Sequence, residues 1–427
     1  MRLSPPLDGL AGRVAERLDR RLNPESAAPL AIAFSGGGDS LALLLAADAW
    51  ARAHGRDLQV LHVDHRLQPQ SRDWAAWCAQ VAASLGRPFT VLAWTGAKPE
   101  RGLPAAARAA RHRLLAEAAR ASGARVILLG HTADDVSEAA AMREAGSTTP
   151  APREWAPSPA WPQGRGVFLL RPMLALGRGE IREALAADDR TWVEDPANAN
   201  QAYARARARA QARGAGAVAR TPPEKSEARA ELARLAEGVD AAPWGGLSIA
   251  RERLRQASPP AARALVGAAC LCAAGESRPP RTDRLERLLD LLRGTEPLVA
   301  TLAGARIEAD GRMVRFLREP GELKRTGLSA QALPPNAPIV WDGRFELRAD
   351  QPGLVVRPLA GHAARLAPSL RRALAATPAH ARGGLPLVFG DPPGPACPLL
   401  EPVAGLAVQT LAGGRLAAAC GRILREP

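Results

Sequence analysis

The sequence is poor in lysine, in aromatic residues and in long apolar segments. Only three of its 57 basic residues are lysines, and aromatic residues make up 4% of its 427 residues. No apolar run approaches the roughly 20 residues that span a bilayer. Residues 1–10, which include Pro5 and Asp8, lack the apolar core of a secretory signal. These absences predict a cytoplasmic protein without a membrane-spanning segment.

Cysteine is also scarce, with five residues scattered along the chain. An odd number of cysteines without regular spacing does not describe a disulfide framework, and no CxxC pair occurs. Cys270 and Cys272 are the one close pair, and they lie in an alanine-rich apolar segment. We expect them to be buried small side chains rather than a metal or redox site.

Positive charge is in excess, and almost all of it comes from arginine. The formal net charge is +14. One explanation is a genome biased toward arginine and alanine. The other is a polyanionic partner, because guanidinium groups bind phosphate oxygens well. Charge alone decides neither between these explanations nor between RNA and DNA.

Apolar strand-like segments alternate with helix-like segments in the first part of the chain. The predicted strands cover residues 30–34, 57–63, 89–94, 126–129 and 167–170. Such alternation predicts an α/β fold, a doubly wound parallel sheet with right-handed crossovers. Polar clusters follow three strands, at residues 35–40, 62–66 and 130–138. We expect them to meet at the carboxyl edge of the sheet, where ligands bind in such folds.

The character of the chain changes twice beyond this region. Residues 1–214 are predicted to form the α/β domain, in which residues 146–166 are an irregular loop. Residues 215–333 are predicted to form a mostly helical substrate domain that ends in a hairpin turning at Asp310. Residues 334–427 are predicted to be a small α+β region, to which the sequence assigns no role.

A glycine-rich loop lies between the first predicted strand and its helix, and its residues are Ser35, Gly36, Gly37, Gly38, Asp39 and Ser40. Glycines allow positive φ angles and let backbone N–H groups approach a ligand closely. The helix that follows presents its positive end, which favours an anion such as phosphate. No Gly-Lys-Ser/Thr follows, so this is not a Walker A loop. A generic strand–turn–helix would explain the glycines but not the flanking Ser and Asp.

Acidic residues follow the fourth strand. Asp135 and Glu138, or Asp134 and Glu138, share one face at the start of a predicted helix. Such carboxylates hold Mg²⁺ against phosphates, or accept a proton from an attacking ammonium group. Helix capping by Asp134 alone is the alternative. His131 precedes them, either as a phosphate donor or as a polar residue at a strand end.

Two groups of arginines are candidates for phosphate contact. Arg108 and Arg111 share a face of a long alanine-rich helix, on which Arg113 also lies. Three further arginines, from Arg205 to Arg209, alternate with alanine after an Asp-Pro turn. Runs of this kind suit contact with a nucleic-acid backbone. A solvated basic helix surface remains the alternative for both.

The glycine-rich loop resembles the SGGxDS loop of the PP-loop ATP pyrophosphatases. Other segments are similar to those of the tRNA(Ile)-lysidine synthetases, over about residues 31–320: His62–Leu67 (HVxHxLR), Arg108–Leu114 (ARxxRYxxL), Gly130–Glu138 (GHHxDDQxET), Leu170–Leu174 (RPLL), Glu194–Asn198 and Tyr203–Arg209 (EDPSN…YxRNxxR), and Thr301–Pro320 (TLGGA…REP). The chain departs from these patterns at His112, Thr132, Val136, Ala139 and Ala206. These departures bear on lysine and tRNA contacts more than on ATP chemistry.

The resemblance implies a ligase that uses ATP and Mg²⁺ to join free lysine to C2 of the wobble cytidine in the CAU anticodon of tRNA(Ile). It implies ATP binding by Ser35–Ser40, catalysis by Asp39, His131, Asp135 and Glu138, metal binding by Asp39 and Asp135, and substrate binding by Arg108, Arg111, Arg205 and Arg209. A homodimer is a further hypothesis. The alternatives are another tRNA-modifying or amide-forming PP-loop synthetase, or a catalytically impaired RNA-binding relative. A tRNA thiolase would need cysteines in a pairing that this chain lacks.

Overall fold

The computed structural model describes residues 4–146, 151–194, 223–325, 327–390 and 394–427. The chain divides into two compact units. The first comprises residues 1–221 and 423–427, and the second comprises residues 222–422. The predicted boundary at residue 214 lies outside the described residues. A separate domain beyond residue 333 stays a prediction.

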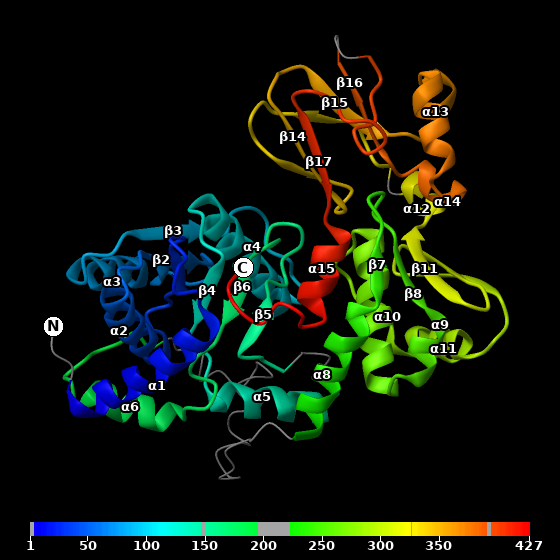
Figure 1. The fold of residues 1–427 in the computed structure, drawn as a ribbon. Helices are drawn as coiled ribbons and strands as arrows, with labels where there is room; N and C mark the ends of the chain where they lie inside the picture. Colours follow the sequence, from blue (N-terminus) through cyan, green and yellow to red (C-terminus); the bar gives the residue numbers. More distant parts are fainter. Residues whose placement is uncertain (1–3, 147–150, 195–222, 326, 391–393) are drawn as a thin grey trace. The chain divides into compact units, whose positions relative to one another are not determined.

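A six-stranded sheet forms the centre of the first unit (Figure 1), in the order β3-β2-β1-β4-β6-β5. Its strands are β1 (Leu30–Ala33), β2 (Leu58–Asp64), β3 (Phe89–Ala93), β4 (Val126–Leu129), β5 (Trp155–Pro157) and β6 (Phe168–Leu170). All neighbouring pairs are parallel except β5 and β6. The five predicted strands are confirmed. The prediction of an irregular loop missed β5, a short antiparallel edge strand.

Helices cover both faces of this sheet, as its strand pattern requires. They are α1 (Pro5–Arg21), α2 (Gly38–Ala53), α3 (Ser71–Ser84), α4 (Leu103–Ala121), α5 (Ala133–Glu144) and α6 (Arg178–Ala186). In β4, Val126 and Leu128 join the core under α1, α2 and α6, whereas Ile127 and Leu129 join the core under α4. Alternate side chains point to opposite faces of a strand. The parallel, doubly wound architecture predicted from the sequence is therefore confirmed.

An antiparallel five-stranded sheet, ordered β7-β8-β11-β10-β9, forms one part of the second unit. Its elements are α8 (Pro223–Glu237), β7 (Val239–Ala241), β8 (Leu247–Ala250), α9 (Arg251–Gln256), α10 (Pro259–Ala274), α11 (Thr282–Arg293), β9 (Leu298–Leu302), β10 (Ala305–Ala309) and β11 (Met313–Arg318). The predicted hairpin turn is confirmed, because the Asp310 carboxylate accepts hydrogen bonds from the N–H groups of Arg312 and Met313. Strands β7 and β8 were not predicted.

Two three-stranded sheets, β12-β15-β16 and β13-β14-β17, complete the second unit. The elements here are α12 (Pro320–Arg325), β12 (Gln331–Leu333), β13 (Ile339–Trp341), β14 (Phe345–Ala349), β15 (Leu354–Pro358), a 3₁₀ turn (Ala363–Arg365), α13 (Pro368–Ala375), α14 (Ala379–Arg382), β16 (Pro386–Phe389), β17 (Leu406–Thr410) and α15 (Ala412–Ala419). The buried carboxylate of Asp342 pairs with Arg344 at 2.7 Å and with Arg318 at 3.1 Å. This ion pair links β11 to the β13–β14 turn.

The last five residues, Ile423–Pro427, belong to the first unit and not to the second. In Figure 1 the C-terminus lies beside β6. The Trp155 indole N–H donates to the carbonyl oxygen of Ile423 at 2.8 Å, and Glu426 N–H donates to the carbonyl oxygen of Arg21 at 2.8 Å. The chain therefore leaves the first unit and returns to it.

Candidate active site

The glycine-rich loop joins β1 to α2, which starts at Gly38. Gly36 has a φ of +91°, and a Cβ added there would lie 3.1 Å from Cys78 Sγ and 3.2 Å from Val193 Cγ2. Only glycine fits this position without strain. Gly37 is the N-cap of α2, and no side chain caps the first turn. The uncapped N–H groups and the helix dipole make this loop suitable for an anion.

The two serines of the loop differ in their surroundings. Ser40 is buried, and its hydroxyl donates to the carbonyl oxygen of Gly37 at 2.8 Å. It also accepts from the Ser35 N–H at 3.3 Å. Ser35 is exposed, and its hydroxyl lies 3.1 Å from that of Ser40. Ser40 thus holds the shape of the loop, while Ser35 is open to a ligand.

The loop after β4 packs directly on the first turn of α2. A Cβ added to Gly130 would lie 3.1 Å from backbone atoms of Asp39. This close approach brings Asp39 beside the acidic residues of α5. Burial raises the pKa of Asp39, and the neighbouring Arg178 opposes that rise. The predicted meeting of these two loops at the carboxyl edge of the sheet is confirmed.

The start of α5 fixes the acidic residues. The carboxylate of Asp135 accepts from the Thr132 N–H at 2.9 Å and from the Thr132 hydroxyl at 3.2 Å. Asp134 accepts from the Arg178 N–H at 2.8 Å. Thr132 stands where the lysidine synthetase pattern has a second histidine, and here it orients Asp135. Capping by Asp134, the alternative left open by the sequence, does not describe this helix.

Three carboxylates, those of Asp39, Asp135 and Glu138, converge on one side chain, and we call them the carboxylate triad. That side chain is Arg178, the first residue of α6. Its guanidinium lies 3.1 Å from Asp39, 3.3 Å from Glu138 and 3.7 Å from Asp135. Sequence reasoning missed Arg178. The clustered carboxylates indicate that a cation lies near them, but no sequence signal distinguishes Arg178 from the other arginines.

Histidine and arginine side chains lie next to the triad. The guanidinium Nε of Arg171 donates to His131 Nδ1 at 2.8 Å. Because Nδ1 of His131 accepts this hydrogen bond, the N–H of the ring is at Nε2, where it can donate to an anion. Arg108 and Arg111 act on Arg171 electrostatically, and together with its burial they lower the pKa of Arg171. The two predicted substrate arginines thus lie near His131. Arg113 instead pairs with Glu117 at the surface.

His112, which replaces the tyrosine of the family pattern, is buried among these guanidiniums. Burial, Arg111 and Arg108 lower its pKa to about 2. In the unfolded chain, histidine gains a proton below a pH of about 6.5, whereas the folded state excludes it. When the pH falls from 7 to about 5.5, the free energy of unfolding of the wild type should therefore decrease. We expect this decrease to be about 1 kcal/mol larger than in His112→Phe, which has no imidazole to protonate. Urea titrations measure this, and equal pH slopes would contradict it.

The polar residues after β2 surround a hollow of about 570 Å³, which Asp64, Arg66, Ser71 and Arg72 help to line. Asp64 accepts from the Arg66 N–H at 2.8 Å, which fixes the turn at the end of the strand. The guanidiniums of Arg66 and Arg72 make this hollow suitable for a phosphate group.

Part of the predicted site lies outside the described residues. This applies to Arg205, Arg209 and the Asp195–Asn198 segment. Within the described ranges, no three His, Cys, Asp or Glu side chains form a metal-binding group. All five cysteines are buried and free, which confirms the predicted burial of Cys270 and Cys272. None of the helices in the described ranges is long and apolar enough to cross a membrane.

The fold and the loop define a class of protein, the PP-loop enzymes, and a PP-loop domain matches residues 10–213. The chain is 46% identical to a tRNA(Ile)-lysidine synthase of Caulobacter vibrioides, over 90% of each chain. It is 34% identical to that of Rhizobium meliloti, covering 76% of this chain and 74% of the relative. The chain belongs to the tRNA(Ile)-lysidine synthase family and is an ATP-dependent ligase.

A solved structure of a U34-tRNA thiolase from Methanococcus maripaludis is more distantly similar. The identity is 12%, the TM-score is 0.40, and the alignment covers 48% of this chain and 73% of that chain. At this level the similarity adds nothing to the assignment.

Proposed function

We propose that this enzyme ligates free lysine to C2 of the wobble cytidine in the CAU anticodon of tRNA(Ile), which changes decoding from AUG to AUA. Membership of the tRNA(Ile)-lysidine synthase family supports this choice of substrates. The observation that carries the chemistry is the uncapped α2 terminus beside the carboxylate triad. The helix terminus can bind the anionic phosphates of ATP, and the triad beside it can bind a cation. A reaction between ATP and an amine requires both.

The reaction has two displacements. Cytidine O2 attacks the α-phosphorus of ATP, and pyrophosphate leaves. The lysine ε-amino nitrogen then attacks C2, and the C2–O2 bond breaks to release AMP. The N–H groups of Gly36–Asp39 and the His131 Nε2–H stabilise the phosphate charge. Glu138, which is buried beside Asp135, accepts the proton that the lysine ammonium loses.

Two of these carboxylates, those of Asp39 and Asp135, suit Mg²⁺, because both already lie next to a cationic guanidinium. Asp39 and Asp135 would hold the ion. Mg²⁺ commonly uses one or two protein carboxylates, with phosphate oxygens and water as its other ligands. When bound, it would neutralise charge on the phosphates of ATP.

The basic side chains are the candidates for binding the tRNA. Arg108 and Arg111 lie beside His131 and would contact phosphates near the reacting base. The Arg205–Arg209 segment stays a prediction for backbone contact. The target base must leave its stack to reach the site, as is usual for chemistry on a nucleobase. We further propose a homodimer that acts in the cytoplasm, and sedimentation tests the assembly.

The decisive assay combines the enzyme with tRNA(Ile) bearing a CAU anticodon, ATP and labelled lysine. We expect label in the tRNA, with one AMP and one pyrophosphate per lysine. Pyrophosphate release with another acceptor would favour an amide-forming synthetase. Binding of tRNA without any turnover would indicate a catalytically impaired relative. The five buried, free cysteines argue against a thiolase.

A further inference from the structure

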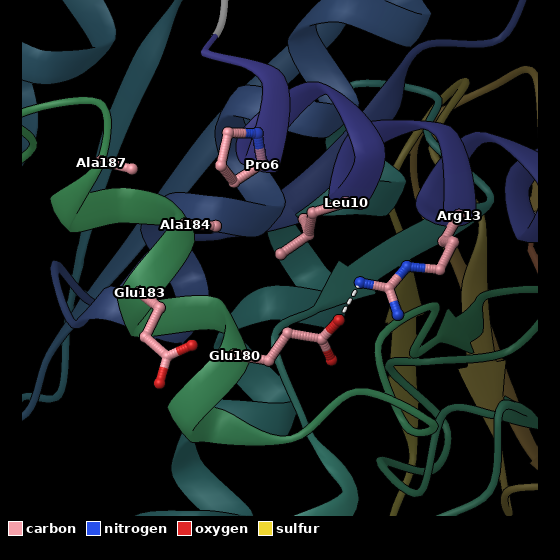
Figure 2. A pocket seen from close by; sticks show the side chains of 7 residues that line it. All are labelled: Pro6, Leu10, Arg13, Glu180, Glu183, Ala184 and Ala187. Carbon is pink, nitrogen blue, oxygen red and sulfur yellow. Dashed lines mark hydrogen bonds and ion pairs between the residues drawn. The ribbon is translucent and has the colours of Figure 1, made fainter.

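Arg178 is held by its backbone at the start of a packed helix. It is the first residue of α6, and its N–H donates to Asp134 Oδ2 at 2.8 Å. Figure 2 shows α6 lying along α1, where the Arg13 guanidinium pairs with Glu180 and both side chains line a hollow of about 410 Å³. Ile181 and Leu185 anchor the buried face of α6. The guanidinium can therefore leave its place only by rotation of its own side chain.

The guanidinium offers one nitrogen to each member of the triad. Nε donates to Asp39 at 3.1 Å, Nη1 donates to Glu138 at 3.3 Å, and Nη2 lies 3.7 Å from Asp135. The Arg178 side chain is 15% exposed and that of Glu138 is 2% exposed. Charges this deeply buried interact strongly, because little water screens them. One guanidinium therefore forms ion pairs with all three carboxylates, while Arg182 and Arg171 act electrostatically on Asp39 and Asp135.

We propose that Arg178 is an internal counter-ion that occupies the triad in the nucleotide-free enzyme and that ATP draws it away, which opens the triad to a cationic ligand. The proposal rests on the proposed function. The ligand is a divalent cation or the lysine ammonium, which share the positive charge that carboxylates select. Arg178 is thus a positioning residue that couples the ATP site to the cation site.

The coupling follows from the position of Asp39. Asp39 lies in the first turn of α2, directly after the loop that receives phosphate, and it holds Arg178 Nε. Phosphates arriving at the loop attract the same guanidinium, since arginine binds phosphate oxygens as readily as carboxylates. Each bond that Arg178 transfers to phosphate releases a carboxylate. By linkage, a bound cation must strengthen ATP binding to the same extent.

Binding to the full chain tests this without turnover. Mn²⁺ binding is followed by electron paramagnetic resonance, and labelled lysine binding by equilibrium dialysis, each without nucleotide. We expect Arg178→Gln to tighten at least one of these ligands by about 5–50-fold, a range typical of coupled sites. Arg178→Lys keeps the cation and should stay near wild type. Arg13→Gln is the matched control, because Arg13 is an exposed arginine of the same unit that pairs with Glu180 of α6.

A second measurement begins with the wild-type chain. A non-hydrolysable ATP analogue should tighten lysine binding to the wild-type chain, and it should have a smaller effect on Arg178→Lys, whose ammonium lacks the guanidinium fork. Unchanged or weaker binding of both probes by Arg178→Gln would overturn the proposal, as would lysine binding that ignores the analogue. If Asp135→Asn also leaves both probes unaffected, the assignment of the triad itself fails.

Discussion

Asp39→Asn is expected to lower kcat/KM for lysine incorporation by about 10²–10³-fold, the loss typical of removing one preorganised electrostatic group. Asp39 is the acidic residue that touches both halves of the site, since it follows the glycine loop and holds Arg178 at 3.1 Å. The asparagine keeps the shape of the side chain but not its charge. ATP-dependent adenylation should therefore fail, whereas the affinity for tRNA should change by less than about twofold, because the arginines proposed to contact tRNA phosphates are unchanged.

Pyrophosphate release and filter binding of labelled tRNA measure the two effects separately. Asp73→Asn is the matched control, because Asp73 also lies in the first turn of a helix, α3, but is exposed. Thermal unfolding of both variants checks that the fold survives. Adenylation at the wild-type rate in Asp39→Asn would mean that ATP does not bind at this loop.

The fold was predictable where local patterns carry enough information. Apolar segments followed by glycine loops located five of the six strands, because strands buried on both faces are continuously apolar. Trp155–Pro157 was not recognisable, since a three-residue edge strand between prolines has no periodicity. Strands β7 and β8 were missed because they have only three and four residues, too few to show a periodicity.

The sequence predicted which loops form the site, but not which side chains contact one another within it. Sequence order placed Asp39 and Asp135 at the same edge of a parallel sheet, and the structure brings them together around Arg178. Nothing in the sequence marks Arg178 among so many arginines, because its importance comes from three carboxylates on two other helices. The sequence presents Arg171 only as part of the Leu170–Leu174 segment. Its hydrogen bond to His131 nevertheless sets which imidazole nitrogen carries the proton.

The role of the C-terminal segment could not be predicted either. Ile423–Pro427 has no recognisable sequence pattern, and its hydrogen-bond partners are hundreds of residues away in the sequence. Glu426 has a side chain that is 0% exposed, and it pairs with the Arg56 guanidinium at 2.8 and 3.3 Å. The same carboxylate accepts from the Asn23 N–H at 3.0 Å and from the Ser26 hydroxyl at 3.2 Å. It therefore closes the junction between α1 and β1.

Glu426→Ala is expected to lower the free energy of unfolding of the first unit by about 3–5 kcal/mol, the usual cost of leaving a buried charge without its partner. Arg56 would keep its bonds to the Ala28 carbonyl oxygen but lose its counter-charge. Arg425→Ala is the matched control, because Arg425 is the preceding residue and is exposed. Urea unfolding and hydrogen exchange in α1 and β1 measure the loss. Removing both charges, in Arg56→Met with Glu426→Leu, should restore part of it, since no unpaired charge then remains buried. Equal stability of Glu426→Ala and wild type would show that Ile423–Pro427 does not hold the first unit together.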